Sequence, residues 1–257
     1  MQRCIVTSFD KQYWQDWGAS WVASLKELAK YKGKVVIINL GDLPFGALGR
    51  LKELGFNVIP AVRRFDRPPL DRFVTLGLYA RDNPGYYAYW EADAYFQADV
   101  DGVFEGSRLA CTIDRSNLPG NRFHAGFLSG PSPAWEVFGN FLTFAADFGN
   151  TSDQDILNDY CRCFDRLVDV ADDHWNCTDL ANLKWRDGFY LGETLAKVIH
   201  PAGPFKQMSD GRQYLFSEKY KNLHDDWHAW LIMGNTTSAR SILKKTGKHL
   251  SLKKNSA

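Results

Sequence analysis

A strand-like stretch that ends in carboxylates carries the clearest chemical pattern in the chain. Residues 86–90 form a continuous aromatic and apolar run after the breaker Asn83-Pro84-Gly85, and Glu91 and Asp93 follow directly. Such a run predicts a strand that is buried on both faces. Carboxylates separated by one residue on an extended chain point to the same side, so they can share one hard divalent cation. The alternative interpretation is an acidic strand end that only faces water.

The segments around this stretch predict an α/β fold. Strands are predicted at residues 3–8, 34–39 and 56–62, with helices over about 14–28 and 44–54 between them. The later predicted elements are a helix at 70–81, strands at 108–113 and 123–128, helices at 133–148 and from about 151, and short strands near 168 and at 197–200. The alternation implies a parallel, Rossmann-like sheet in one domain. Open α/β sheets bind ligands at the carboxyl ends of their strands, so the acidic strand end is the predicted site.

Composition and missing motifs argue against several classes of protein. The 257 residues are 45% hydrophobic and 24% charged, which is ordinary for a globular protein with one large α/β domain. A net charge of +1 argues against whole-molecule attraction to nucleic acid. No Gly-x-Gly-x-x-Gly follows the first strand and no Gly-Lys-Ser/Thr P-loop occurs. The main support for a dinucleotide-binding enzyme or an ATPase is therefore missing.

The N-terminal residues and the cysteines favour a cytoplasmic protein. The first residues lead into a strand-like segment without a signal-peptide pattern, and no apolar run approaches the roughly 20 residues that span a bilayer. The five scattered cysteines are then expected to be reduced thiols. Cys161 and Cys163, followed by His174 and Cys177, suggest a zinc site as an alternative, but their spacing fits no familiar pattern.

Five motifs, taken in chain order, resemble those of the nucleotide-sugar glycosyltransferases of the GT-A fold. The likeness is greatest to the retaining family 8 group, which includes glycogenin and bacterial lipooligosaccharide galactosyltransferases. In that family a strand ends in Tyr-Leu-Asp-x-Asp, an Arg precedes it on a helix, and Phe-Asn-Ala-Gly, Asp-Gln-Asp-x-Leu-Asn and His-Phe-x-Gly-x-x-Lys follow. The corresponding residues here are Tyr89-Trp90-Glu91-Ala92-Asp93, Arg72, Phe123-His124-Ala125-Gly126, Asp153-Gln154-Asp155-Ile156-Leu157-Asn158, and the segment from His200 through Gly203 to Lys206.

The order and spacing of these motifs over residues 3–207 carry the likeness, because each motif alone is weak. Two positions depart from the family pattern. Glu91 replaces an Asp and still offers oxygen ligands. His124 replaces an Asn, which puts the contacts on the acceptor side in question.

The resemblance implies a single GT-A catalytic domain, with a mixed Rossmann-like sheet flanked by helices. We expect this domain over residues 1–207, and a C-terminal helical extension with a basic tail over residues 208–257. The implied activity is that of a hexosyltransferase, which moves a hexose from a nucleotide sugar, expected to be UDP-linked, to a hydroxyl acceptor. Retention of anomeric configuration is expected over inversion. The acceptor, whether glycan, lipid or protein, is not identified.

The resemblance also assigns roles to individual residues. Asp93 and His200 are the implied metal ligands, and Glu91 would act through the metal or the ribose. Mixed oxygen and imidazole ligation suits Mn²⁺ better than Mg²⁺. The implied donor-binding residues are Thr7, Asp10 and Ala92, with Tyr13 for the base and Gly203 and Lys206 for the diphosphate. The implied residues around the reacting carbon are Arg72, Asp153 and Gln154, although a carboxylate in a first helical turn also has a structural explanation.

Two other functions stay open. A protein that kept donor binding but lost transfer would fit the departures at Glu91 and His124. A sugar-1-phosphate nucleotidyltransferase shares the layered plan, but it usually carries a Gly-rich basic loop after the first strand, and residues 7–10 are not such a loop.

The pattern of the C-terminal segment has two interpretations. It predicts either peripheral contact with the inner face of an anionic membrane or a solvated tail. Trp227 and Trp230 precede a group of basic residues that has no acid among them. This group consists of Arg240, Lys244, Lys245, Lys248, Lys253 and Lys254. A basic, partly aromatic helix can rest on anionic lipid, and chain ends are often solvated.

Overall fold

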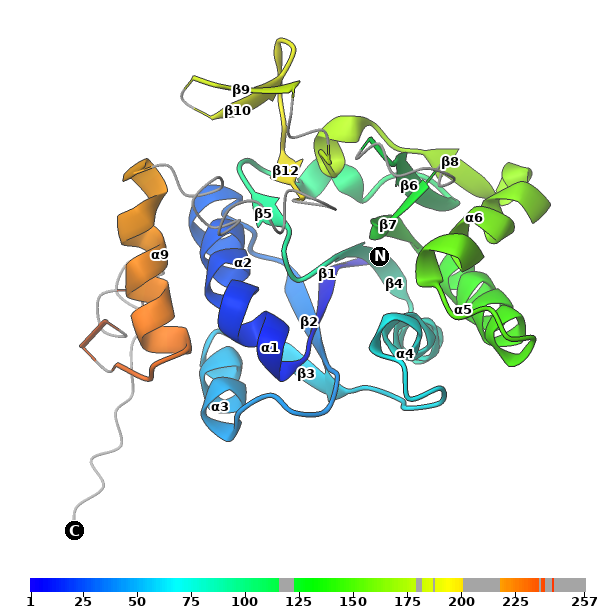
Figure 1. Cartoon of the computed structure of the whole chain (residues 1–257), viewed down its shortest axis with the longest axis horizontal. Helices are drawn as coiled ribbons and strands as arrows, with labels where there is room; N and C mark the ends of the chain where they lie inside the picture. The colour runs from blue at the N-terminus through cyan, green and yellow to red at the C-terminus, as the bar shows by residue number, and fades with distance from the viewer. Residues whose placement is uncertain are drawn as a thin grey trace.

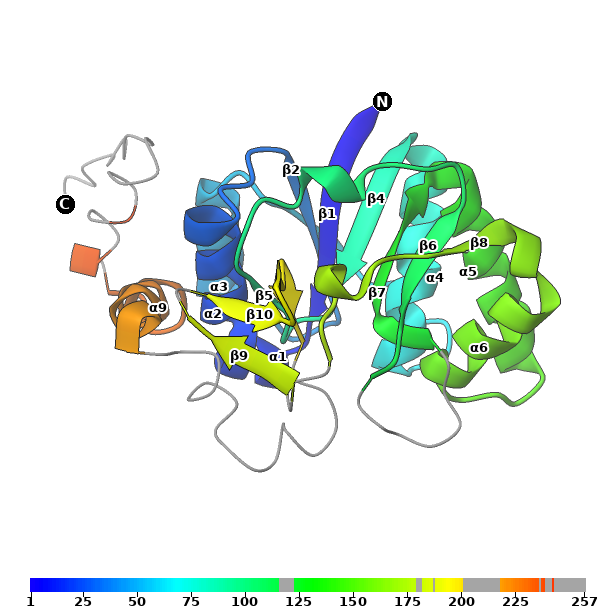
Figure 2. The ribbon, with the colours of Figure 1, turned by 90° about the horizontal axis from the view of Figure 1, so that it is seen from above.

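The chain folds as a mixed β-sheet with helices on both faces, as a computed structural model shows (Figures 1 and 2). The structure describes residues 1–115, 123–178, 182–186, 188–200, 218–235, 237–238 and 242. Among these residues, seven strands form the main sheet in the order β3-β2-β1-β4-β7-β6-β8. Their bounds are β1 Gln2–Phe9, β2 Lys34–Asn39, β3 Asn57–Pro60, β4 Gly85–Trp90, β6 Leu109–Ile113, β7 Phe123–Pro131 and β8 Val168–Val170.

The direction of the strands changes between β4 and β7. β1 is parallel to β2 and β4, and β2 is parallel to β3. β7 is antiparallel to β4 and β6, whereas β6 and β8 are parallel. The predicted alternation of strands and helices thus gives a parallel sheet for the first four strands. The expectation of a mixed sheet is confirmed.

Helices cover the two faces of the sheet and form two apolar cores (Figure 2). One face carries α1 Lys11–Tyr13, α2 Ala19–Ala23 and α3 Phe45–Glu53, and the other carries α4 Pro68–Asp82, α5 Ser132–Asp147 and α6 Asp153–Cys163. Neighbouring side chains of a strand point to opposite faces. Accordingly, Ile5 of β1 lies in the first core, and Cys4 and Val6 lie in the second.

The helix predicted over residues 14–28 is interrupted by two π-helical turns. They span Trp14–Gly18 and Ser24–Leu28, on either side of α2. The amphipathic pattern is correct, because Trp14 and Trp21 are buried. A Cβ on Gly18 would lie 2.4 Å from Cε3 of the Trp14 ring. A glycine is therefore needed at this position, because the indole of Trp14 packs against the wide π-helical turn.

Short strands complete the structure beside the main sheet. β5 Tyr95–Phe96 pairs antiparallel with β12 Val198–Ile199, while β9 Leu183–Trp185, β10 Phe189–Leu191 and β11 Thr194–Leu195 pair with one another. Single 3₁₀ turns lie at Asp101–Val103, Asp165–Leu167 and Asp173–Trp175. The pairing of β5 with β12 returns the chain near residue 200 to the end of β4.

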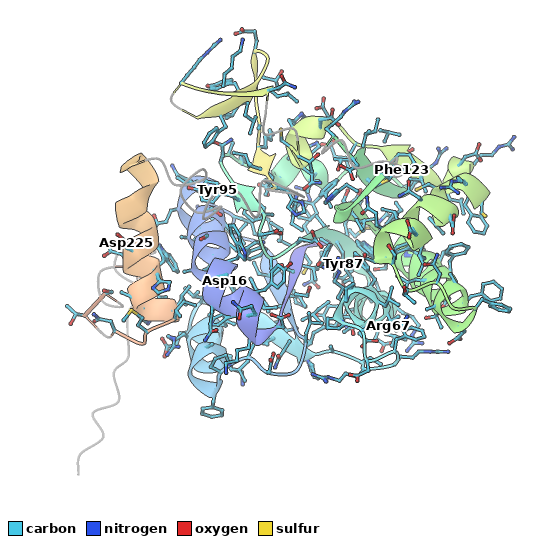
Figure 3. All side chains as sticks on the ribbon, viewed as in Figure 1. Asp16, Arg67, Tyr87, Tyr95, Phe123 and Asp225 are labelled. Carbon is cyan, nitrogen blue, oxygen red and sulfur yellow. The ribbon has the colours of Figure 1, made fainter. Side chains whose placement is uncertain are left out.

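The C-terminal helix α9, Glu218–Leu231, packs beside α2 (Figure 1). Trp227, Trp230 and Leu231 are buried in the same core as Trp21, whereas Asp225 is exposed (Figure 3). The alternative of an aromatic helix resting on lipid is therefore wrong for Trp227 and Trp230, because the two indoles are part of the core.

The basic residues from Arg240 onward lie outside the described residues, and membrane contact through them stays a prediction. The expected boundary between residues 207 and 208 also lies there. In the part of the chain that the structure describes, no helix combines the length and the hydropathy needed to cross a membrane.

Candidate functional site

The end of β4 projects Glu91 and Asp93 from the edge of the sheet. The backbone N–H of Glu91 donates a 3.0 Å hydrogen bond to the carbonyl of Gly126 on β7, so Glu91 extends the β4–β7 pairing by one residue. The chain then turns, and the N–H of Ala94 donates to the carbonyl of Glu91 at 3.1 Å. This turn places Asp93 between the main sheet and β5.

The pairing of β5 with β12 brings His200 to the same place. Ile199 is the register partner of Tyr95, so the next residue, His200, lies against the turn that carries Asp93. Asp93 and His200 are separated by more than 100 residues in the sequence, and the antiparallel pairing of β5 with β12 brings them together.

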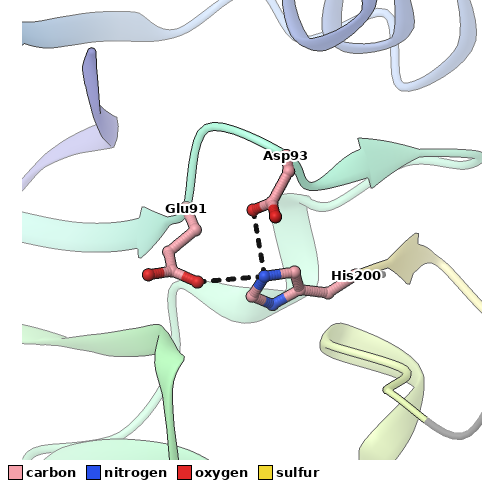
Figure 4. A group of neighbouring side chains, drawn as sticks. All are labelled: Glu91, Asp93 and His200. Atoms are coloured by element: carbon pink, nitrogen blue, oxygen red, sulfur yellow. Dashed lines mark ion pairs between the residues drawn. The ribbon is translucent and has the colours of Figure 1, made fainter. Parts of the chain in front are cut away.

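Glu91, Asp93 and His200 form a compact group (Figure 4). His200 Nε2 lies 3.0 Å from Glu91 Oε2 and 3.0 Å from Asp93 Oδ1. One potential ligand atom from each residue lies within 4.8 Å of the others, and the described residues contain no other group of three His, Cys, Asp or Glu with this geometry. Asp93 and His200 are buried, and Glu91 is partly exposed. The structure thus brings together the three residues that the sequence predicts as metal ligands.

The zinc alternative is wrong for the described residues. Cys161 belongs to the core beneath α5 and α6, whereas Cys177 belongs to a separate cluster around β5 and β12. Cys163 is exposed. These side chains are divided between different packing regions and do not converge.

The surroundings of His200 fix its ring from two sides. Nδ1 of His200 lies 3.0 Å from Oδ1 of Asn176, and the His124 ring meets the His200 ring edge to face, with centroids 4.8 Å apart. A Cβ on Gly126 would lie 2.1 Å from Cε1 of His200 and 2.7 Å from Cε1 of His124. A glycine at position 126 therefore leaves the room that the two imidazole rings occupy.

Arg72 on α4 joins two carboxylates across the edge of the sheet. Its Nη2 lies 2.7 Å from Oε1 of Glu91 and 2.5 Å from Oδ2 of Asp153. The guanidinium also lies over the Tyr89 ring, 5.3 Å from the centroid. Asp153 is the first residue of α6, and the Ser152 hydroxyl caps that helix by accepting from the N–H of Asp155. Glu91 therefore contacts both Arg72 and His200.

Burial and charge act in opposite directions on these groups. Burial alone would lower the pKa of His200, but the carboxylates of Asp93 and Glu91 raise it to about 9. Burial and the neighbouring His200 lower the pKa of His124 to about 4, so its imidazole is neutral. Burial raises the pKa of Asp153 more than Arg72 lowers it. The charges around Arg72 outweigh its burial and raise its pKa.

A cleft of about 300 Å³ opens beside this group. Its lining includes Ser8 and Asp10, where β1 ends, and Glu91 and Ala92, where β4 ends. Tyr13 lines the same cleft and is 38% exposed. The cleft lies at the carboxyl ends of parallel strands, as predicted for the site.

Of the ten described residues that the sequence predicts for the site, six line this cleft, Asp93 and His200 belong to the group beside it, and two are engaged elsewhere. Thr7 is fully buried, on the face of β1 opposite Ser8. The amide of Gln154 accepts from the N–H of Ala125 at 2.7 Å and donates to the carbonyl of Phe123, so it is bound to the backbone of β7. Gly203 and Lys206 lie outside the described residues.

Sequence reasoning missed Asn176, Ser8 and the hydroxyl of Tyr89. No periodicity marks the segment that carries Asn176. A bridge between Cys177 and Ile199 brings it to His200. Ser8 and Tyr89 share a 3.1 Å hydrogen bond between β1 and β4, which only the strand order reveals.

The residues of this group fit a divalent cation. Two carboxylates and one imidazole are oxygen and nitrogen donors of the kind that Mn²⁺ accepts. The other ring nitrogen of His200, Nδ1, also lies within hydrogen-bond distance of Asn176, and metal-binding imidazoles usually have such a partner. Fold and site together define an α/β protein with a cleft beside a candidate cation site at the carboxyl ends of its strands.

Comparison with solved structures identifies glycosyltransferases that share this fold. The chain is similar to the glycosyltransferase GlyE of Streptococcus pneumoniae TIGR4 in its apo form (TM-score 0.62, 16% identity, 99% of this chain and 66% of that chain covered). A second structure of GlyE gives a TM-score of 0.60 at 17% identity, with 98% and 67% covered. The galactosyltransferase LgtC, in complex with donor and acceptor sugar analogues, gives 0.60 at 16% identity, with 86% and 95% covered.

These matches confirm the expected GT-A glycosyltransferase fold. The chain spans about two thirds of the length of the GlyE chains. No family model matches the chain, and neither does the sequence of any curated protein.

Proposed function

We propose that this chain is a metal-dependent glycosyltransferase that moves a hexose from a UDP-sugar to a hydroxyl acceptor, with retention of configuration. The observation that carries the proposal is the group of Glu91, Asp93 and His200 beside a cleft of about 300 Å³, in a fold shared with glycosyltransferases. Neither part alone would be sufficient, because the fold does not specify chemistry and an acidic cluster does not specify a substrate.

In this proposal Asp93, His200 and Glu91 hold the cation, and Mn²⁺ suits this donor set better than Mg²⁺. When bound, the cation would supply positive charge for the departing nucleoside diphosphate. Lys206 and Gly203, which follow His200 in the sequence, add a positive charge and backbone donors for the same diphosphate. These two assignments rest on the sequence alone.

The nucleoside end of the donor is assigned to the β1 side of the cleft. Asp10 caps α1 by accepting from the N–H of Tyr13 at 2.7 Å, so the position of its carboxylate is fixed. Tyr13 offers a partly exposed ring for base stacking. Ser8 takes the place predicted for Thr7, because Ser8 lines the cleft whereas Thr7 lies on the opposite face of β1. Ala92 lies between the two carboxylates and lines the same cleft.

Asp153 is the residue assigned to the reacting carbon of the sugar. Its carboxylate lines the cleft and is held by Arg72. Gln154 contributes by fixing the start of α6 to β7, since its amide is bound to the carbonyl of Phe123 and the N–H of Ala125. Retaining transfer requires either a nucleophile or a dissociative path on one face of the sugar. In this proposal Asp153 acts as the nucleophile or stabilises positive charge on that carbon.

One observation favours a second candidate, a nucleotide-sugar-binding protein without transferase activity. Oε1 of Glu91 is bound to Arg72 at 2.7 Å, so this carboxylate is divided between the arginine and the candidate cation site. An Asp in the same place would be one methylene shorter. If the longer side chain displaces the cation from its working position, binding would persist without transfer.

The experiment that tests the proposal measures binding and turnover separately. Thermal melting of the protein is followed with a panel of nucleotide sugars, with and without Mn²⁺, and release of free nucleoside diphosphate is then measured for each donor that binds. The proposal expects stabilisation by UDP-sugars only with Mn²⁺, together with UDP release.

The matched control for this experiment is Asp93→Asn, which keeps the shape of the side chain and removes its charge. We expect this variant to fold and to lose both signals. Mn²⁺-dependent binding without release would favour the second candidate. Stabilisation by no nucleotide sugar would contradict both functions.

A further inference from the structure

Three polar side chains behind the candidate metal site form one connected hydrogen-bond network. It runs from the backbone of Gly126 to His124, from His124 to Asn176, and from Asn176 to His200. All four residues are buried. Buried polar groups in a low dielectric are held to one pattern of donors and acceptors, because a mismatch leaves an unsatisfied group.

The direction of the network can be worked out from its one fixed donor. The backbone N–H of Gly126 donates to Nδ1 of His124 at 3.0 Å, and a backbone N–H cannot act as an acceptor. Nδ1 of His124 is therefore unprotonated, and the proton of that ring is on Nε2. This tautomer is set by the chain itself and not by any ligand.

The same atom of His124 then orients the amide of Asn176. The Asn176 nitrogen lies 3.5 Å from Nδ1 of His124 and 3.1 Å from the hydroxyl of Thr112. A hydroxyl can donate or accept, so Thr112 would tolerate either orientation of the amide. The unprotonated Nδ1 accepts only, so it selects the orientation in which the NH₂ group faces His124 and Oδ1 faces away.

We propose that Asn176 is a positioning residue for the candidate metal site. Its Oδ1 lies 3.0 Å from Nδ1 of His200 and requires that nitrogen to carry a proton. Nε2 of His200 is then the ring atom directed at Glu91 and Asp93, 3.0 Å from an oxygen of each. The inference rests on the metal site of the proposed function. It assigns to His124, at the position where the sequence departs from the family motif, the role of orienting Asn176.

The main test is a double-mutant cycle with Mn²⁺ alone as the probe, read from the free-ion signal in electron paramagnetic resonance. Asn176→Leu keeps the size of the side chain and removes both polar atoms. Loss of a partner that orients a metal ligand typically lowers metal affinity about 10- to 100-fold, and we expect a loss in this range. In the His200→Ala background the same substitution should change Mn²⁺ affinity less than threefold, because Asn176 acts only through the His200 ring.

Thr178→Val is the matched control in the same segment. Thr178 is buried, and its hydroxyl accepts from the N–H of Arg115 at 3.0 Å, away from His200. This variant also loses a buried hydroxyl, so a general loosening of the segment would lower its Mn²⁺ affinity as well. We expect its affinity to equal that of the wild type. An equal loss in both variants, or a full loss from Asn176→Leu in the His200→Ala background, would overturn the inference.

A second readout is taken from the wild-type protein, and a variant serves only to assign the signals. Nitrogen-15 chemical shifts of the histidine side chains in the metal-free protein report which ring nitrogen carries the proton. We expect His124 to be neutral and protonated on Nε2, with its signals assigned by their absence in His124→Asn. A His124 ring protonated on Nδ1 would overturn the network alone. Failure of the wild type to bind Mn²⁺ would instead overturn the metal site of the proposed function, together with the role of Asn176 in it.

Discussion

Gly126→Ala tests the geometry of the site most directly, because it adds a single methyl group where two imidazole rings meet. In the present backbone that methyl carbon would lie 2.1 Å from Cε1 of His200, and ordinary contact begins at 3.4 Å. The difference is about 1.3 Å, and His200 has to retreat by this amount unless β7 itself moves. His124, at 2.7 Å, blocks movement in its own direction.

A displacement of this size removes His200 as a ligand. Metal–ligand distances in a proper site vary by about 0.2 Å, so a shift several times larger leaves Nε2 out of reach. Loss of a partner behind a ligand lowers metal affinity by up to about 100-fold, and loss of the ligand itself should exceed that, so we expect Mn²⁺ affinity to fall by at least about 100-fold, or about 2.7 kcal/mol. Overpacking should also lower the free energy of unfolding by about 1–3 kcal/mol.

The assay measures Mn²⁺ binding by electron paramagnetic resonance and folding by circular dichroism on the same samples. Gly130→Ala is the control on the same strand. Its added carbon would lie 3.1 Å from the carbonyl oxygen of Arg108, which costs stability but does not touch the site. We expect it to melt earlier and to bind Mn²⁺ normally. Wild-type affinity in a folded Gly126→Ala protein would refute the reasoning, because His200 would then not be held where the structure places it.

Three further outcomes are expected. Arg72→Met removes the guanidinium between Glu91 and Asp153, and it should lower the free energy of unfolding by about 3–5 kcal/mol at pH 7. This loss of stability relative to the wild type should be smaller at pH 5, because the unpaired buried carboxylates take up protons there. An equal loss at both pH values in thermal melts would contradict this. His200 has a pKa raised from 6.5 to about 9, so the stability that it contributes to the metal-free protein is present below pH 6.5 and is lost as pH rises through 9. Mn²⁺ must displace that proton, so its affinity should rise over the same range, and a flat affinity profile in the same titration would exclude His200 as a ligand. Trp227→Ala should lower the free energy of unfolding by about 3–5 kcal/mol in denaturant titrations, whereas a change below 1 kcal/mol would mean that α9 is not part of the core.

The sequence was sufficient to predict the elements that carry the acidic strand end. A long apolar run followed by Glu91 and Asp93 predicted a buried strand with an acidic end, and the order of the other motifs added Arg72, Asp153 and His200 to the same site. The mixed sheet and most boundaries agree with the structure to within two or three residues. These features are local in the sequence or depend on the alternation of strands and helices.

Other features depend on contacts between distant segments and carry no local signal. Asn176 meets His200 only because Cys177 bridges to Ile199, and nothing in the segment marks that pairing. Gln154 was predicted to face the sugar, but its amide is bound to β7 instead. The aromatic pattern of α9 predicted an apolar face correctly, but not that α2 covers it.

The contact between α9 and α2 has a consequence for the synthesis of the protein. Trp21 and Trp227 belong to one core but are separated by 206 positions in the chain. At about 5–20 residues per second, a ribosome needs about 10–40 s to travel from one to the other. During that interval the first strands can pair while the outer side of α2 is still bare. During synthesis the nascent chain therefore exposes an apolar surface beside a nearly complete sheet. We expect a ribosome-associated chaperone to bind that surface until α9 has been made.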